Sequence, residues 1–473
     1  MLTKKWQKKF MISLEETKKK LDDVGCGMCL AKWTQTTIYL HNGQTHSCHH
    51  PPTHPIPIEE IKRNPTALHN THYKKLQRQK MLSGDRPSEC DYCWKVEDNS
   101  EVFSDRIYKS NSDWAQPHYN QIIKNIDGKP YTLDWRADYN PTYVEVIFSS
   151  ACNLKCSYCA PHISTKWMEE IQKHGHYPTS TKFNNLDHLK QMGAMPIPHR
   201  EENPYVEAFW KWWPDLYRDL HTFRISGGEP LLSKDTFKVL DYILEQKVPN
   251  HNLTISINTN MMAPDAQMEE FYDKVNRITQ ERRVKEFQVF TSVDTWGEDA
   301  DYIRNGLKFE KFWDNCNKFL EKCEIPSLTF MVTYNALSVF RFDEFIKGVY
   351  ELKKKHMNKK RVYPLQVAVI DISYLRHPAH QTVQVLPMKF KSLIEKQIKL
   401  LKELQRDDKF EYFTDMEISK LQRIYDWMTS KKDMKKIKRQ QRDFGRFFRE
   451  HDKRRGTDFV KVFPKLKKLY EDK

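Results

Sequence analysis

The sequence has no long hydrophobic run. No stretch approaches the roughly eighteen consecutive apolar residues that a membrane-spanning helix needs. The opening residues, MLTKKWQKKFMISLEETKKK, also lack the apolar segment of a secretory signal peptide. We therefore expect a soluble, cytoplasmic protein that does not bind membranes. Cysteines in that compartment stay reduced, so clustered cysteines indicate metal binding rather than disulfide bonds.

The chain lacks an excess of acidic residues. It has 78 Lys and Arg against 63 Asp and Glu, which gives a formal net charge of +15 over 473 residues. A basic surface attracts nucleic acids or acidic partners, but a solvated, lysine-rich helical surface gives the same excess. No segment resembles a known RNA-binding module, and the basic segments also contain many acidic residues. Nucleic acid is therefore a secondary expectation.

No internal repeat is present, and the first part of the chain has little periodicity. Residues 1–135 are rich in His, Pro and Asn, with one strand pattern at TTIYLHNG and one helix pattern at NTHYKKLQRQKML. A segment with so little apolar content needs additional stabilisation, which its cysteines can provide. We expect residues 1–135 to form a small cysteine-rich domain.

From residue 136 the chain alternates between strand and helix patterns. Six segments look like strands: TYVEVIFSS, FRISGGEP, LTISINTN, FQVFTSVDT, SLTFMVTYN and LQVAVIDIS. This alternation predicts an α/β fold with parallel strands. Six strands are fewer than the eight of a closed barrel, so we expect a partial (β/α)6 TIM-like barrel over 136–380. Residues 381–473 indicate a basic, packed helical extension without metal-ligand or nucleophile spacing.

Two aromatic or sulfur-containing groups are expected to pack rather than to react. The long connection from Pro161 to His221 contains YVEAFWKWWPDLYRDLH, an amphipathic helix pattern whose tryptophans suit core or lid packing. Cys316 and Cys323 lie seven residues apart on an apolar helix face, which is typical of core cysteines.

The central cysteine group lacks a fourth member. The stretch SSACNLKCSYCA contains Cys152, Cys156 and Cys159, and no other cysteine is near them. Thiolates favour soft metals, and structural zinc needs four protein ligands. A [4Fe–4S] cluster held by three cysteines instead leaves one iron free for a substrate or cofactor. The group also follows the first predicted strand, at the end where such folds place active sites. A zinc site with a remote fourth ligand is the alternative.

The spacing of these cysteines, with the aromatic Tyr158 before the last of them, resembles the cluster motif of the radical SAM superfamily. The next strand ends in SGGEP, which resembles the glycine-rich motif of that family. The resemblance extends over roughly residues 20 to 380. It implies an enzyme that reductively cleaves S-adenosylmethionine at a [4Fe–4S] cluster. The resulting 5′-deoxyadenosyl radical would abstract hydrogen from a substrate.

The same resemblance implies further residues around S-adenosylmethionine. Backbone groups of the glycine-rich motif would contact its methionine part. The motif INTNM would bring Asn260 near the cofactor, although Met261 stands where glycine is usual. The motif FTSVDT would supply Ser292 as a ribose or carboxylate contact and Asp294 as a substrate-side acid, and DYIRNG would supply Arg304 for the carboxylate. The cofactor-binding residues implied are Tyr158, Gly227, Gly228, Glu229, Pro230, Asn260, Ser292, Asp294 and Arg304.

The N-terminal cysteines resemble the auxiliary-cluster modules called SPASM and twitch. Cys29, Gly43 and Cys48 have the opening spacing of such a module, with a hairpin from Tyr39 to Cys48 that turns at HNG. The family usually places this module after the barrel, whereas here it precedes the barrel. The ligands implied for an auxiliary iron–sulfur cluster are Cys29, Cys48, Cys90 and Cys93. The paired set Cys26, Cys29, Cys90 and Cys93 would instead suit structural zinc, and His49 is an alternate ligand.

The substrate does not follow from these motifs. Relatives with such modules often modify peptides, so we expect a peptide or protein substrate and a reductase such as flavodoxin or ferredoxin as electron donor. An enzyme that modifies nucleotides or RNA is one alternative. A noncatalytic iron–sulfur or S-adenosylmethionine-binding factor is another, although the intact pair of motifs speaks against it.

Overall fold

The computed structural model describes residues 12–126, 129–132, 134–198 and 201–472. Contacts divide the chain into two compact units. Unit 1 comprises residues 1–148, 193–225 and 250–255, and unit 2 comprises 149–192, 226–249 and 256–473. This division interleaves the chain, so the domain boundaries predicted at residues 135 and 380 stay predictions.

Unit 1 contains a mixed sheet. Strands β1 (Gln35–Tyr39), β6 (Tyr143–Ile147) and β8 (Thr222–Ile225) run parallel. Strand β2 (Gln44–His46) pairs antiparallel with β1, and β3 (His54–Pro55) pairs antiparallel with β2. The predicted hairpin at HNG is confirmed as β1–β2. Its turn needs glycine, because Gly43 has a φ of +68° and an added Cβ would lie 2.2 Å from the ring of Tyr205.

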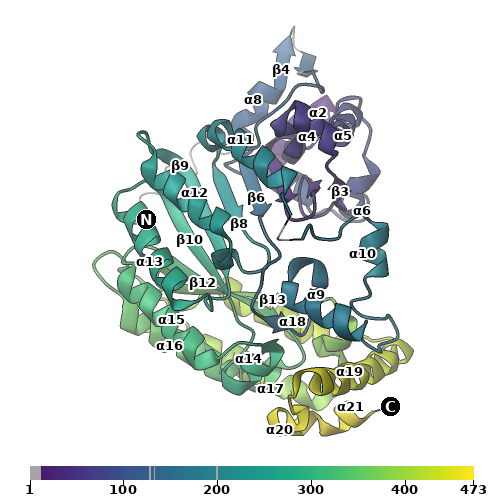
Figure 1. The fold of residues 1–473 in the computed structure, drawn as a ribbon, viewed down its shortest axis with the longest axis vertical. Helices are drawn as coiled ribbons and strands as arrows, with labels where there is room; N and C mark the ends of the chain where they lie inside the picture. Colours follow the sequence, from purple (N-terminus) through teal and green to yellow (C-terminus); the bar gives the residue numbers. More distant parts are fainter. Residues whose placement is uncertain (1–11, 127–128, 133, 199–200, 473) are drawn as a thin grey trace. The chain divides into compact units, whose positions relative to one another are not determined.

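Unit 1 also contains helices (Figure 1). They are α2 (Leu14–Val24), α3 (Ala31–Thr34), α4 (Ile58–Arg63), α5 (His72–Leu82), α6 (Asp91–Asn99), α7 (Asp105–Ser110), α8 (Tyr119–Ile122) and α11 (Pro204–Asp219), with a hairpin of β4 (Ile123–Ile126) and β5 (Lys129–Thr132). The packing role predicted for the tryptophans is confirmed for Trp212 and Trp213 of α11, which are buried. The ring of Trp213 lies 4.8 Å from that of Phe223 in β8.

Unit 2 contains the rest of the parallel strands. Strand β9 (Asn250–Thr259) contributes residues to both units, and in unit 2 the order is β9, β10 (Val284–Ser292), β12 (Ser327–Tyr334) and β13 (Ala368–Tyr374). Strands β10, β12 and β13 run parallel. All six strands predicted from residue 136 onward are present, as β6, β8, β9, β10, β12 and β13. The predicted α/β fold with mostly parallel strands is confirmed.

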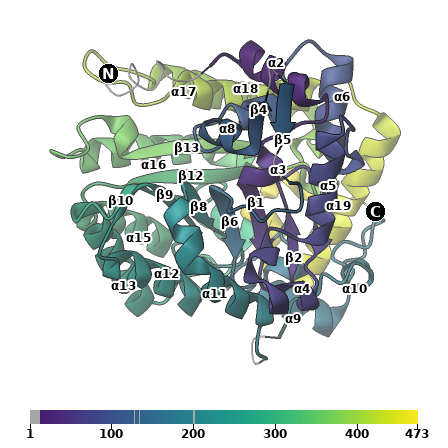
Figure 2. The same cartoon turned by 90° about the horizontal axis from the view of Figure 1, so that it is seen from above.

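Helices connect and cover the strands of unit 2 (Figures 1 and 2). They are α9 (Thr165–His174), α10 (Asp187–Gln191), α12 (Lys234–Glu245), α13 (Asp265–Gln280), α14 (Gly297–Ile303), α15 (Phe309–Lys322), α16 (Phe342–His356), α17 (Lys391–Glu403), α18 (Asp415–Thr429), α19 (Met434–Arg455), α20 (Phe459–Val462) and α21 (Lys467–Glu471). Helices α13, α15 and α16 pack on β10, β12 and β13 respectively. Cys316 and Cys323 are fully buried, as predicted for core cysteines.

The C-terminal region is helical and packed, as predicted. Helix α18 begins with a capping box between Thr414 and Glu417 and packs on β13. Helix α19 buries an apolar face that includes Phe444, Phe447 and Phe448. Among the helices that the structure describes, none combines the length and apolar character needed to cross a membrane.

Candidate active site

A cavity of about 320 Å³ in unit 2 collects most of the predicted site residues. Those that line it are Cys152, Cys156, Tyr158, Cys159, Gly227, Gly228, Asn260, Ser292 and Arg304. They come from the cysteine loop (152–159), from the loop after β8 and from the ends of β9 and β10. The carboxyl ends of parallel strands are where α/β folds bind ligands.

Backbone hydrogen bonds fix the cysteine loop. Cys156 lies in the short strand β7 (Lys155–Cys156), which pairs antiparallel with β11 (Arg304–Asn305). The backbone N–H of Ser157 donates to the carbonyl of Ile303 at 2.8 Å. At the start of the loop, the N–H of Cys152 donates to Oγ1 of Thr165 at 3.1 Å. The three thiols are therefore presented from an ordered backbone.

Burial controls the protonation of the three thiols. Burial first, and then the nearby Cys156, raise the pKa of Cys152 to about 12. Burial also raises the pKa of Cys156, against the opposing charge of Arg304, and the pKa of Cys159. Thiols with such pKa values are protonated at neutral pH, so a metal that binds here must displace protons.

The ligands around the cavity suit an iron–sulfur cluster. Structural zinc takes four protein ligands, and the cavity lining that the structure describes holds no fourth cysteine and no histidine. Three soft thiolate ligands that face one cavity fit an iron–sulfur cluster.

A buried ion pair lies beside the middle cysteine. The guanidinium of Arg304 donates to both carboxylate oxygens of Asp294, from Nε at 2.9 Å and from Nη2 at 3.1 Å. It also donates to the hydroxyl of Tyr158 at 2.7 Å and, from Nη1, to Sγ of Cys156 at 3.6 Å. The Tyr158 hydroxyl in turn donates to Asp294. This network places a fixed positive charge next to a cluster ligand.

The glycine-rich loop packs against the cysteine loop. An added Cβ at Gly228 would lie 2.2 Å from the carbonyl oxygen of Ala151, and Gly227 has a φ of +126°. The N–H of Glu229 donates to the same carbonyl at 2.7 Å. Only glycine permits this close approach of the two backbones.

The side chain of Glu229 ties the glycine-rich loop to the end of β9. It accepts hydrogen bonds from the hydroxyl of Thr259 at 2.7 Å, from the N–H of Asn260 at 2.6 Å and from the N–H of Leu231 at 3.0 Å. Burial raises the pKa of Glu229 to about 7, although these hydrogen bonds oppose the shift. The carboxyl group holds two loops together and does not line the cavity.

Three predicted cofactor-binding residues do not line the cavity: Glu229, Pro230 and Asp294. Asp294 is fully buried and engaged by Arg304 and Tyr158, so a substrate-side role for it stays a prediction. Asn260 lines the cavity, yet its amide also donates to Asn153 at 2.8 Å.

Sequence reasoning missed four polar residues of the cavity: Ser226, Asn258, Thr259 and Thr333. Each lies at, or directly after, the carboxyl end of β8, β9 or β12. The rule that ligands bind at the carboxyl ends of parallel strands could have found them.

In unit 1 the N-terminal cysteines form a second group. Burial raises the pKa of the Cys90 and Cys93 thiols to about 12. The charges of Cys29 and Cys48 contribute to this rise. Cys26 is exposed and its Sγ instead lies 3.1 Å from the carbonyl oxygen of Gly84.

His49 and His50 converge on Asp105 next to this group. The three offer ligand atoms within 4.8 Å of one another. Nε2 of His50 lies 2.7 Å from the carboxylate, and Nε2 of His49 lies 3.6 Å from it. The ammonium of Lys109 lies 3.5 Å from Nδ1 of His49. Polar contacts therefore bring these three side chains together.

The central part of the chain matches a known family. Residues 146–349 match the family model of the radical SAM superfamily. This segment contains the three cysteines, the glycine-rich loop and Arg304. The segment is therefore similar to the radical SAM superfamily, whose enzymes use a [4Fe–4S] cluster and S-adenosylmethionine.

Two individual proteins are similar to this chain. Molybdenum cofactor biosynthesis protein 1 of Dictyostelium discoideum is 23% identical over 252 residues, which is 50% of this chain and 35% of that protein. The chain therefore spans about a third of the length of this relative. The crystal structure of Streptococcus suis SuiB bound to S-adenosylmethionine aligns over 82% of this chain and 72% of that one, with 12% identity and a TM-score of 0.35.

Proposed function

We propose that this chain is a radical SAM enzyme that cleaves S-adenosylmethionine reductively and abstracts hydrogen from a substrate through the resulting 5′-deoxyadenosyl radical. The observation that carries the proposal is one cavity in unit 2 that joins the three cysteines, the glycine-rich backbone and Arg304. A [4Fe–4S] cluster held by Cys152, Cys156 and Cys159 would supply the electron for this cleavage.

The residues of this chain bind and orient the reactants. Cys152, Cys156 and Cys159 hold the cluster as thiolates. The Arg304 guanidinium, kept charged and oriented by Asp294, favours the anionic ligand set beside it. The bare backbone at Gly227 and Gly228, with the polar groups at the strand ends, orients S-adenosylmethionine in the cavity. The apolar Leu154 and Ile163 on its wall limit access of water.

The production of 5′-deoxyadenosine tests this function. The full chain is reconstituted anaerobically with iron and sulfide, reduced with dithionite and given S-adenosylmethionine. We expect 5′-deoxyadenosine from the wild type and from Cys316→Ala, a matched control in which a buried core cysteine is removed. We expect none from Cys156→Ala. Equal product from Cys156→Ala and Cys316→Ala would refute the assignment of the cluster to the cysteine loop.

We further propose an auxiliary iron–sulfur cluster held by Cys29, Cys48, Cys90 and Cys93. Burial supports this set, because Cys93 is buried and Cys29, Cys48 and Cys90 are partly buried, whereas Cys26 is exposed. Iron and zinc analysis of the reconstituted chain tests it. We expect iron for two clusters in the wild type and in Cys26→Ser, and for one cluster in Cys90→Ser. Iron for one cluster plus one zinc in the wild type would contradict the proposal.

A peptide or protein is the substrate we propose first, with flavodoxin or ferredoxin as the electron donor. The N-terminal cysteines resemble SPASM and twitch modules, and enzymes with such modules often modify peptides or proteins. The relative named for molybdenum cofactor biosynthesis favours a small molecule as the second candidate. Deuterium transfer into 5′-deoxyadenosine distinguishes the two. Transfer from deuterated cellular protein would support the first candidate, whereas transfer only from the deuterated small-molecule fraction would reject it.

A further inference from the structure

Three consecutive carbonyl groups in the cysteine loop each accept a hydrogen bond from a side chain. The donors are Nη1 of Arg455 to Lys155 at 2.7 Å, Nε1 of Trp167 to Cys156 at 2.8 Å, and Nε2 of Gln381 to Ser157 at 3.0 Å. Two of the donors lie beyond residue 349, outside the segment that matches the radical SAM superfamily. The C-terminal region thus reaches the peptide groups on both sides of Cys156.

Arg455 is held in place before it meets the loop. Its side chain is fully buried, and its guanidinium donates to both carboxylate oxygens of Glu170, at 3.0 and 3.2 Å. Its central carbon lies 4.6 Å from the ring centroid of Trp167. Burial alone would raise the pKa of Glu170, but the hydrogen bond and charge of Arg455 lower it to about 2. The guanidinium is therefore oriented and charge-balanced.

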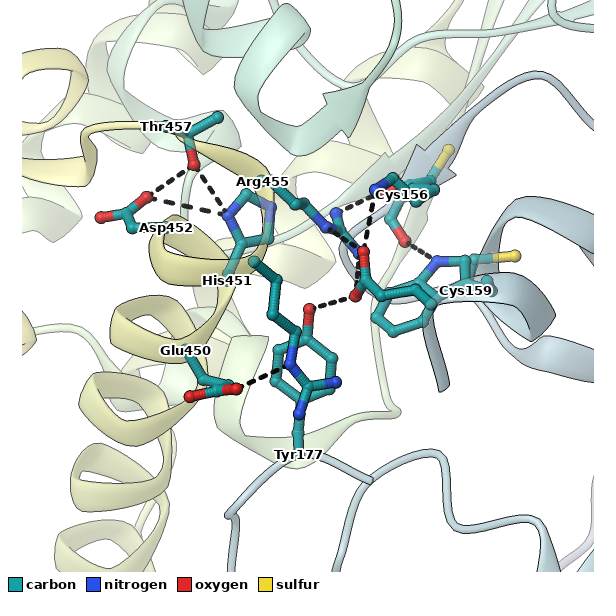
Figure 3. Close-up of polar contacts among 12 residues, drawn as sticks. Cys156, Cys159, Tyr177, Glu450, His451, Asp452, Arg455 and Thr457 are labelled. Carbon is teal, nitrogen blue, oxygen red and sulfur yellow. Dashed lines mark hydrogen bonds and ion pairs between the residues drawn. The ribbon is translucent and has the colours of Figure 1, made fainter. Parts of the chain in front are cut away.

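The helix that carries Arg455 ends at a fixed point (Figure 3). Arg455 is the last residue of α19, and Gly456 ends the helix in the left-handed conformation with a φ of +66°. One turn earlier, the carboxylate of Asp452 accepts hydrogen bonds from the hydroxyls of Tyr302 at 2.7 Å and Thr457 at 2.7 Å. The end of α19 cannot shift without breaking these bonds.

Gln381 forms hydrogen bonds with Ser157, the residue that follows Cys156. Its amide both donates to the carbonyl of Ser157 and accepts from the hydroxyl of that residue at 2.8 Å. Gln381 is 1% exposed, so water does not replace these bonds. A residue bonded at both ends of its amide, in a buried place, fixes the orientation of the peptide group that it meets.

We propose that Arg455 and Gln381 are positioning residues for the cluster. Arg455 fixes the peptide group between Lys155 and Cys156, Gln381 fixes the one after Ser157, and together they set the backbone that orients the Cys156 thiolate. The C-terminal region is then part of the cofactor site. This inference rests on the proposed function, since Cys156 must hold the cluster. Hydrogen bonds around a ligand and nearby charge tune the reduction potential of an iron–sulfur cluster.

Electron paramagnetic resonance of the reduced, reconstituted full chain tests the inference. The signal that changes on addition of S-adenosylmethionine identifies the relevant cluster, and a redox titration of that signal gives its midpoint potential. Arg455→Gln removes a positive charge near Cys156 and leaves Glu170 paired with Lys155 at 2.9 Å. We expect its potential to become more negative and its response to S-adenosylmethionine to weaken.

Three further variants sharpen the test. Gln381→Met removes both hydrogen bonds without a change in charge, and we expect it to weaken the response. Arg455→Lys keeps the positive charge but loses the planar guanidinium. We expect it to have the midpoint potential of the wild type but a weaker response to S-adenosylmethionine. Arg442→Gln removes an exposed arginine from the same helix, and we expect wild-type behaviour.

The outcomes separate the inference from the proposed function. A wild-type signal that does not respond to S-adenosylmethionine contradicts the proposed function. If the wild-type signal responds to S-adenosylmethionine, and Arg455→Gln and Gln381→Met have the same midpoint potential and the same response, the positioning role is overturned and the proposed function stands. If circular dichroism finds Arg455→Gln unfolded, Gln381→Met decides, and its equality with the wild type overturns the inference.

Discussion

Replacing Asp294 by Asn tests the buried network beside Cys156. Asn keeps the size of the side chain but removes its charge, which leaves the Arg304 guanidinium buried without its counter-ion. Burial lowers the pKa of Arg304, yet the charge of Asp294 raises it well above its usual value, so the guanidinium stays charged. The variant must therefore bury an unbalanced positive charge, because Arg304 is 6% exposed.

The expected loss of stability is large. Two unit charges about 4 Å apart interact by about 4 kcal/mol at an effective dielectric constant of about 20. Breaking a buried pair by removing one partner costs about 3–5 kcal/mol in other proteins. The hydrogen bond that Asp294 accepts from the N–H of Thr333 at 3.0 Å can persist with Asn, so it adds little. We expect Asp294→Asn to lower the free energy of unfolding by about 4 kcal/mol.

Urea denaturation of the cluster-free chain measures this loss. Arg304→Met and the double variant complete a cycle, and we expect the double variant to be more stable than the sum of the single losses predicts. Glu169→Gln, which breaks an exposed pair with Lys166, is the control and should change stability by less than about 1 kcal/mol. A loss below about 1 kcal/mol for Asp294→Asn, or strict additivity in the cycle, would refute the reasoning.

Two further predictions concern the glycine-rich loop. Gly228→Ala places a Cβ against the Ala151 carbonyl, so we expect loss of 5′-deoxyadenosine formation. The control Gly175→Ala is strained by a φ of +75° but has open space around it, so it should keep the activity, and an active Gly228→Ala would contradict the close packing. The raised pKa of Glu229 means that the folded chain holds a proton which the unfolded chain releases from pH 4.5 upward. The free energy of unfolding of the wild type should therefore fall by about 3 kcal/mol relative to that of Glu229→Gln as the pH rises from 4.5 to 7. Urea denaturation at several pH values measures this difference, and a difference that stays constant with pH would falsify the prediction.

The sequence predicts the central strands well, because their signals are local. Six apolar or alternating segments became six strands, and β12 illustrates why: Leu328, Phe330, Val332 and Tyr334 are buried while the residues between them are partly exposed. The hairpin at HNG is equally local. By contrast, the parallel pairing of β1 with β6 joins segments about a hundred residues apart, and no turn between them specifies it.

The site also combines residues with a local sequence signal and residues without one. The cysteines and glycines follow motifs of a few residues, and the structure brings them to one cavity. The partners of Cys156 and its neighbours do not follow such motifs. Arg455 meets Lys155 across 300 positions of sequence, and Gln381 meets Ser157 across 224. Ordinary arginine and glutamine residues in a helical, basic region carry no local signal of such a contact, so only the folded chain reveals it.

On the proposed function, the cysteine loop holds a cluster with one position open to S-adenosylmethionine. The most direct measurement is the electron paramagnetic resonance spectrum of the reduced, reconstituted chain before and after S-adenosylmethionine is added. We predict that the spectrum of the wild type changes, and that in Cys156→Ala the responsive signal is absent. A wild-type spectrum that is identical with and without saturating S-adenosylmethionine would contradict the account.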